Sequence, residues 1–125
     1  MNPFKLFGPR TRTAEQTRLV REKKALLVDL REFGAWCDGI AKAAALLPYS
    51  DLSGPRELWG PFLAQRGDRE LLLYSSSAAL SAAAARLLSA EGIAATGAGT
   101  LHDWDRAGWP VCKPRGCRHG QPPKT

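Results

Sequence analysis

Residues 70–88 read ELLLYSSSAALSAAAARLL, an apolar run followed at once by three serines and an alanine-rich segment. The unbroken apolar run is typical of a strand that is buried on both faces, as in a parallel sheet. The alanine-rich segment repeats its leucines at helical spacing, so a helix is expected to follow the serines. A strand, a short polar loop and a helix aim backbone N–H groups and the positive end of the helix at one point. We therefore expect an anion-binding loop here, at the carboxyl end of a strand, where open α/β sheets carry their sites.

The rest of the chain alternates between strand patterns and helix patterns. Strands are expected at 25–30, 44–47 and 93–96, and helices at 13–24, 56–65 and 101–107. Thr13 and Gln16 have the spacing of a capping box, which supports a helix start there. A short helical turn is expected at 31–39, a turn at 97–99 and a disordered tail from Cys112 onward. Alternating strands and helices predict an α/β fold with a mainly parallel sheet.

Charge divides the 125 residues into three parts. Residues 1–12 carry a charge of +3 and residues 112–125 a charge of +4, while residues 13–111 carry −1. We expect one domain at 13–111, a basic arm before it and a basic tail after it. A nearly neutral body does not indicate a nucleic-acid-binding protein. Two interpretations stay open for the basic ends: solvated tails that favour solubility, or a surface for an acidic protein partner.

Hydropathy and cysteine usage indicate the class of protein. No apolar run is long enough to cross a bilayer, and the first residues lack a secretory pattern. We therefore expect a cytoplasmic protein that does not associate with a membrane. Three cysteines, Cys37, Cys112 and Cys117, make a disulfide framework unexpected. We interpret Cys37 as a small buried side chain. Cys112, Cys117 and His119 have no fourth ligand, so neither a metal site nor a cofactor is predicted; the two thiols are either inert or able to accept sulfur.

Several segments, taken in order, resemble a single-domain rhodanese-like (sulfurtransferase-type) protein. They are LVDLRE at 27–32, PYSDL at 48–52, LLY at 72–74, GAGTLHDW at 97–104 and AGWPV at 107–111. The resemblance implies an open, mainly parallel sheet of four to five strands with helices on both faces. It also implies that Asp29 orders the active loop from below and that Arg31 lies near the pocket rim. From the residues alone, we favour structural roles: a strand-end carboxylate that accepts local N–H bonds, and a surface arginine paired with Glu32 or Asp38.

The active loop departs from the family pattern at three positions. A nucleophilic Cys directly after the strand, and a Gly and an Arg within the loop, are replaced here by Ser75, Ala78 and Leu80. A rhodanese carries sulfur as a persulfide on that Cys, and a serine hydroxyl forms no persulfide. Ser75 is therefore predicted to be inactive. Two explanations stay open: natural loss of the site, or replacement of a native Cys.

These observations predict a non-catalytic binding or regulatory module that still binds a small, thiosulfate-like anion. The predicted anion-binding loop comprises Ser76, Ser77, Ala78, Ala79, Leu80 and Ser81. The alternative is a sulfurtransferase or sulfur carrier, with the persulfide on a native Cys at position 75 or on Cys112 or Cys117.

Overall fold

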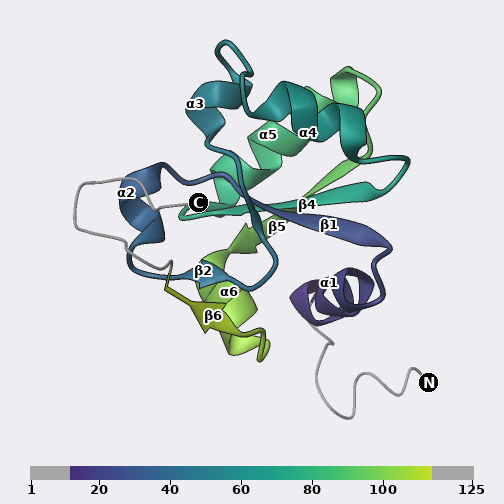
Figure 1. Cartoon of the computed structure of the whole chain (residues 1–125). Coiled ribbons are helices and arrows are strands. Elements are labelled where there is room, and N and C mark those ends of the chain that lie inside the picture. Colours follow the sequence, from purple (N-terminus) through teal and green to yellow (C-terminus); the bar gives the residue numbers. More distant parts are fainter. Residues whose placement is uncertain (1–11, 114–125) are drawn as a thin grey trace.

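A four-stranded parallel sheet forms the centre of the computed structural model, which describes residues 12–113 (Figure 1). The order across the sheet is β3 (Ala45–Leu46), β1 (Ala25–Asp29), β4 (Glu70–Ser75) and β5 (Ala95–Thr100). Every neighbouring pair is parallel. The predicted α/β class and the predicted central strands are confirmed.

Helices cover both faces of the sheet, as predicted. Above it in Figure 1 lie α3 (Tyr49–Leu52), α4 (Trp59–Gln65) and α5 (Ala78–Ala90), and below it lie α1 (Arg12–Arg21) and α6 (Leu101–Arg106). A short helix, α2 (Phe33–Trp36), follows β1. The sheet residues alternate between the two layers because successive side chains of a strand point to opposite faces. Leu71 and Leu73 pack with Trp59 and Leu88 in one core, and Leu72 packs with Trp104 in the other. Each fully buried leucine contributes roughly 1.5–3 kcal/mol of hydrophobic stabilisation.

The fourth strand of the sheet differs from the prediction. β5 runs over Ala95–Thr100, so it includes the residues that were predicted to form a turn at 97–99. A Cβ added to Gly97 would lie only 3.0 Å from the backbone of Ala82. Gly97 therefore allows α5 and β5 to lie close together, and it does not form a turn here.

The helices between β3 and β4 also differ from the prediction. The helix expected at 56–65 begins only at Trp59. The Asp51 carboxylate accepts the N–H groups of Glu57, Leu58 and Trp59 at 2.8–3.0 Å, which satisfies the backbone before α4. Asp51 itself lies in α3, a short helix that the sequence pattern did not predict.

A small second sheet contradicts the prediction that Cys112 begins a disordered tail. β2 (Ile40–Ala41) and β6 (Val111–Cys112) pair in antiparallel orientation, with Ile40 opposite Cys112. Cys37 is half-buried and disulfide-bonded, so the interpretation of a simple buried thiol is wrong, and so is the expectation that the cysteines form no disulfide. Cys117, His119 and most of both basic ends lie outside the described residues. In the part of the chain that the structure describes, no helix combines the length and apolarity that a membrane crossing requires.

Candidate functional site

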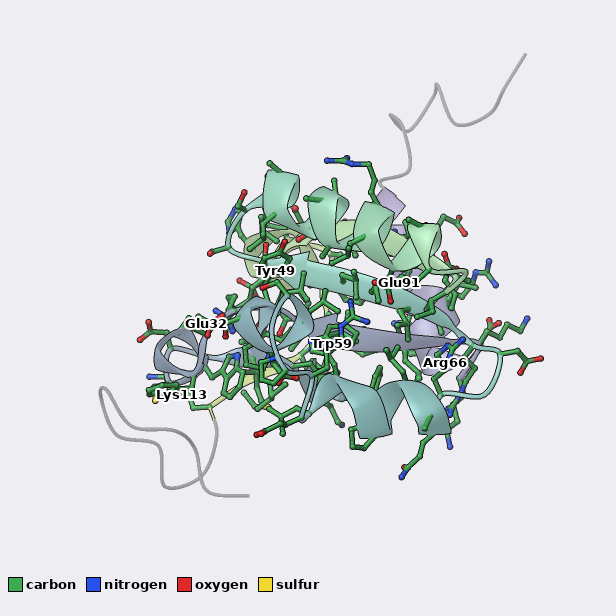
Figure 2. All side chains as sticks on the ribbon, turned by 90° about the horizontal axis from the view of Figure 1, so that it is seen from above. Glu32, Tyr49, Trp59, Arg66, Glu91 and Lys113 are labelled. Atoms are coloured by element: carbon green, nitrogen blue, oxygen red, sulfur yellow. The ribbon has the colours of Figure 1, made fainter. Side chains whose placement is uncertain are left out.

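The predicted site lies at the carboxyl ends of β1 and β4. The chain leaves β1 toward β3 and leaves β4 toward β5, so the two loops diverge from neighbouring strands. Such a point of divergence is where open α/β sheets bind ligands. Figure 2 shows Glu32 and Tyr49 at this end of the sheet, with Arg66 and Glu91 at the opposite end. Asp29 and Ser75, the last residues of the two strands, are therefore brought to the same edge.

Ser75 is fully buried, and its hydroxyl is engaged within the chain. Its Oγ donates to the carbonyl of Ser77 at 2.6 Å and accepts the N–H of Ser77 at 3.1 Å. It also lies 2.9 Å from the Oγ of Ser81, which in turn donates to the carbonyl of Gly99 at 2.8 Å. These bonds join the end of β4, the start of α5 and the end of β5. The Ser75 side chain thus closes a turn and faces away from solvent.

Most of the predicted anion-binding loop is helical. α5 begins at Ala78, and Ser77 is its N-cap, whose Oγ accepts the N–H of Leu80 at 3.2 Å. Only Ser76 and Ser77 lie outside the helix, while Ala78, Ala79, Leu80 and Ser81 form its first turn. Ser76, Ser77, Ala78 and Ala79 are exposed. The N-terminus of this 13-residue helix therefore lies at residues exposed to solvent, and the Arg position of the family pattern, Leu80, carries no charge.

Asp29 and Arg31 form a buried ion pair. Asp29 is fully buried, and the Arg31 side chain is 8% exposed, with its Nη2 donating to Asp29 Oδ2 at 2.8 Å. The backbone N–H of Arg31 donates to Asp29 Oδ1 at 2.8 Å, and Nη2 also donates to the carbonyl of Gly39 at 2.6 Å. Burial lowers the pKa of the Arg31 guanidinium, but the hydrogen bond and charge of Asp29 outweigh it and keep this pKa above its ordinary value. Arg31 thus pairs with Asp29, not with Glu32 or Asp38, and is not a surface residue.

Tyr74 completes this network, and the sequence reasoning missed it. Its hydroxyl donates to Asp29 Oδ2 at 2.7 Å and accepts the N–H of Ala41 at 3.0 Å. The Arg31 guanidinium carbon lies 5.7 Å from the centroid of the Tyr74 ring. Burial, and then the charge of Asp29, raise the pKa of Tyr74 far above its usual value. A tyrosine that ends an apolar strand was the available signal, because a buried phenol needs a hydrogen-bond partner.

The remaining predicted site residues lie in β6 or outside the described chain. Cys112 is an exposed free thiol in β6, and Cys117 falls beyond the described residues. Within residues 12–113, no cluster of three His, Cys, Asp or Glu side chains is suited to hold a metal ion.

Comparison with known proteins identifies the fold. No protein-family model matches the sequence, and no curated protein matches it. Among solved structures, the chain is similar to a rhodanese-related protein from Thermoplasma volcanium, with a TM-score of 0.63 and 23% identity over 80% of this chain and 93% of that one. It is also similar to protein hp1203 from Helicobacter pylori 26695, with a TM-score of 0.60 and 20% identity over 79% of this chain and 87% of that one. At these identities the likeness concerns the fold.

Proposed function

We propose that this chain, which has the rhodanese-like fold, does not transfer sulfur through position 75 and works as a non-catalytic binding module. The observation that carries the proposal is the state of Ser75, which is fully buried and bonded to Ser77 and Ser81. Persulfide chemistry requires a thiolate that a sulfur donor reaches. Ser75 has a hydroxyl in place of the thiol, and because that hydroxyl is buried in a turn, a sulfur donor does not reach it.

The binding surface that we propose is the exposed start of α5. Ser76, Ala78 and Ala79 are exposed there, and the helix dipole favours an anion such as thiosulfate. The nearby cation, Arg31, is neutralised by Asp29. Among the described residues, binding then depends on backbone N–H groups and the helix dipole, so we expect weak affinity that falls with added salt. The basic ends of the chain extend the proposal to an acidic protein partner, which retention with and without residues 1–12 and 112–125 tests.

Sulfur loading is the first test. The full chain, Ser75→Cys and Ser76→Cys are incubated with thiosulfate, freed of excess reagent and weighed by intact mass spectrometry. We expect no cyanide-removable sulfur on the unaltered chain or on Ser75→Cys, because position 75 is buried. Ser76→Cys places a thiol in the same loop at an exposed position and shows whether exposure alone permits loading.

Two outcomes would contradict the proposal. A sulfur gained only by Ser75→Cys supports the sulfurtransferase whose native Cys has been replaced. A sulfur gained by the unaltered chain supports a sulfur carrier and directs attention to Cys112, an exposed free thiol.

Anion binding is tested separately by titrating thiosulfate at low salt and following backbone amide NMR signals. We expect shifts at Ser76, Ala78 and Ala79. Ala79→Glu adds a negative charge in the first turn of α5, which suits the helix dipole but repels an anion, so these shifts should disappear while the fold remains. Ala90→Glu makes the same change at the other end of α5 and should leave them unchanged.

A further inference from the structure

A hollow of about 410 Å³ lies between the end of α1 and the segments 42–43 and 108–110. Its described lining consists of Val20, Arg21, Lys42, Ala43, Gly108, Trp109 and Pro110. All of these residues except Val20 and Trp109 are exposed, so the hollow is open to solvent. Its volume falls in the range of small-molecule sites, about 300–1,000 Å³. A small molecule therefore has access to the side chains that line it.

Trp109 forms a fixed wall of this hollow. The indole is buried and packs edge-on against Trp104, with 5.5 Å between the ring centroids. Its Nε1–H donates to the carbonyl of Lys42 at 2.8 Å, and the backbone N–H of Lys42 donates to the carbonyl of Pro110 at 2.9 Å. These bonds hold the two segments together. The apolar wall is therefore already formed before a ligand arrives, which lowers the cost of binding.

Arg21 and Lys42 give the hollow a positive charge. Both residues are exposed, and the guanidinium carbon of Arg21 lies 5.9 Å from the centroid of the Trp109 ring. Within residues 12–113, neither of the two cations forms an ion pair. Glu22 follows Arg21 in the chain, but its carboxylate pairs with two other cations. No acidic residue belongs to the described lining, so the two charges of the hollow have no counter-ion there.

We propose that this hollow binds a small aromatic carboxylate. The planar guanidinium of Arg21 presents paired N–H donors that fit the two oxygens of a carboxylate, and Lys42 adds a second charge on a flexible stem. Val20, Trp109 and Pro110 supply the apolar walls for the ring. Exposed ion pairs alone are weak, and a ring alone leaves both cations unpaired, so affinity requires both parts of the ligand. Because α1 and α5 cover opposite faces of the sheet (Figure 1), this inference is independent of the function proposed for the start of α5.

The test titrates three probes into the full chain at constant ionic strength while backbone amide and indole N–H NMR signals are followed. Phenylacetate carries the ring and the carboxylate, phenylacetamide keeps the ring without the charge, and acetate keeps the charge without the ring. We expect phenylacetate to shift the signals of Ala43, Gly108 and the Trp109 indole, with each of the other two probes binding at least tenfold more weakly. Binding of either control probe within tenfold of phenylacetate, shifts at other residues, or no saturable shift up to the solubility limit of phenylacetate would overturn the proposal.

Four variants complete the test. Arg21→Gln and Lys42→Gln each remove one charge from an exposed side chain and should weaken phenylacetate binding at least about threefold. Arg86→Gln removes the same charge from an exposed position of α5 and should leave the binding unchanged. Ala79→Glu, which is designed to abolish anion binding at the start of α5, should also leave it unchanged, so failure of one proposal is distinguishable from failure of the other. Undiminished binding in Arg21→Gln or in Lys42→Gln, or an equal loss in Arg86→Gln, with the fold intact, would also overturn the inference.

Discussion

The hydroxyl of Tyr74 donates a hydrogen bond of 2.7 Å to Oδ2 of Asp29, and both side chains are fully buried. The two residues lie opposite each other in the parallel pair of β1 and β4. Arg31 neutralises the carboxylate from the side, and Ala41 donates its N–H to the phenol. The carboxyl end of β1 and β4 is therefore held together by a network whose polar groups already have partners. Breaking such a network by removing one member leaves buried groups unpaired.

Tyr74→Phe is predicted to destabilise the fold by about 1–3 kcal/mol, because the Ala41 N–H loses its acceptor and Asp29 loses a donor. Urea unfolding at neutral pH measures the difference. Tyr49→Phe is the matched control: the Tyr49 hydroxyl makes no hydrogen bond to any residue of the described chain, so we expect a change within about 0.5 kcal/mol. Equal effects of the two substitutions would show that the phenol of Tyr74 contributes nothing specific.

Alkaline pH is predicted to reduce the contribution of the Tyr74 hydroxyl to the free energy of unfolding. Burial and the charge of Asp29 raise the pKa of Tyr74 above its ordinary value of 10.0. The folded protein then keeps this proton at a pH where the unfolded chain has lost it, so the stabilisation is complete below pH 10 and falls above it. The difference in unfolding free energy between the unaltered protein and Tyr74→Phe should shrink by about 1.4 kcal/mol per pH unit above pH 10. A difference that stays constant from pH 9 to pH 11.5 would contradict the raised pKa.

Gly99→Ala is predicted to be more harmful than an alanine substitution on a helix. Gly99 has a φ of +75°, and an added Cβ would fall against Oδ2 of Asp103. That oxygen accepts the N–H of Thr100 at 3.0 Å in the capping box of α6. Strain and a damaged cap together should cost about 1–3 kcal/mol. Gly34→Ala, where nothing lies within 4 Å of the new Cβ, should be neutral or stabilising by up to about 1 kcal/mol. Thermal unfolding of the two variants compares them, and equal midpoints would refute the steric argument.

The strands with continuous apolar sequence could be predicted, because burial on both faces leaves a local pattern. β1 and β4 follow this pattern. Their successive side chains point to opposite faces of the sheet, so Leu72 and Leu73 pack in different cores. β5 could not be predicted in full, since its Gly97-Ala98-Gly99 segment has the local signature of a turn. Its pairing with β4 and the close approach of Ala82 depend on residues that are distant in sequence. β2 and β6 are two residues each, too short to leave any periodicity.

The candidate site was predictable in position but not in bonding. The family resemblance implies that Asp29 lies beside the loop that begins at Ser75, and the two residues end neighbouring strands at the same end of the sheet. The sequence does not indicate that Arg31 folds back onto Asp29 or that Ser75 is bonded to Ser81, because side-chain direction and burial decide both.

The two hydroxyls of Ser75 and Ser81 are predicted to act as one unit. Their oxygens lie 2.9 Å apart; Ser75 donates to the carbonyl of Ser77 at 2.6 Å, and Ser81 donates to the carbonyl of Gly99 at 2.8 Å and also lies 3.2 Å from the carbonyl of Ser77. Each single substitution to alanine removes a hydrogen-bond partner of the other, buried hydroxyl. Each should therefore lower the free energy of unfolding by about 1–3 kcal/mol. The double substitution removes both hydroxyls and should cost at least about 0.5 kcal/mol less than the sum of the single costs. Ser81→Ala combined with Ser53→Ala is the control, because the exposed Ser53 bonds to the Tyr49 carbonyl and the two costs should add within about 0.5 kcal/mol. Urea unfolding measures these costs. If the costs of Ser75→Ala and Ser81→Ala add as closely as those of the control pair, the two hydroxyls act independently, and Ser75 does not depend on Ser81 for its place in the turn.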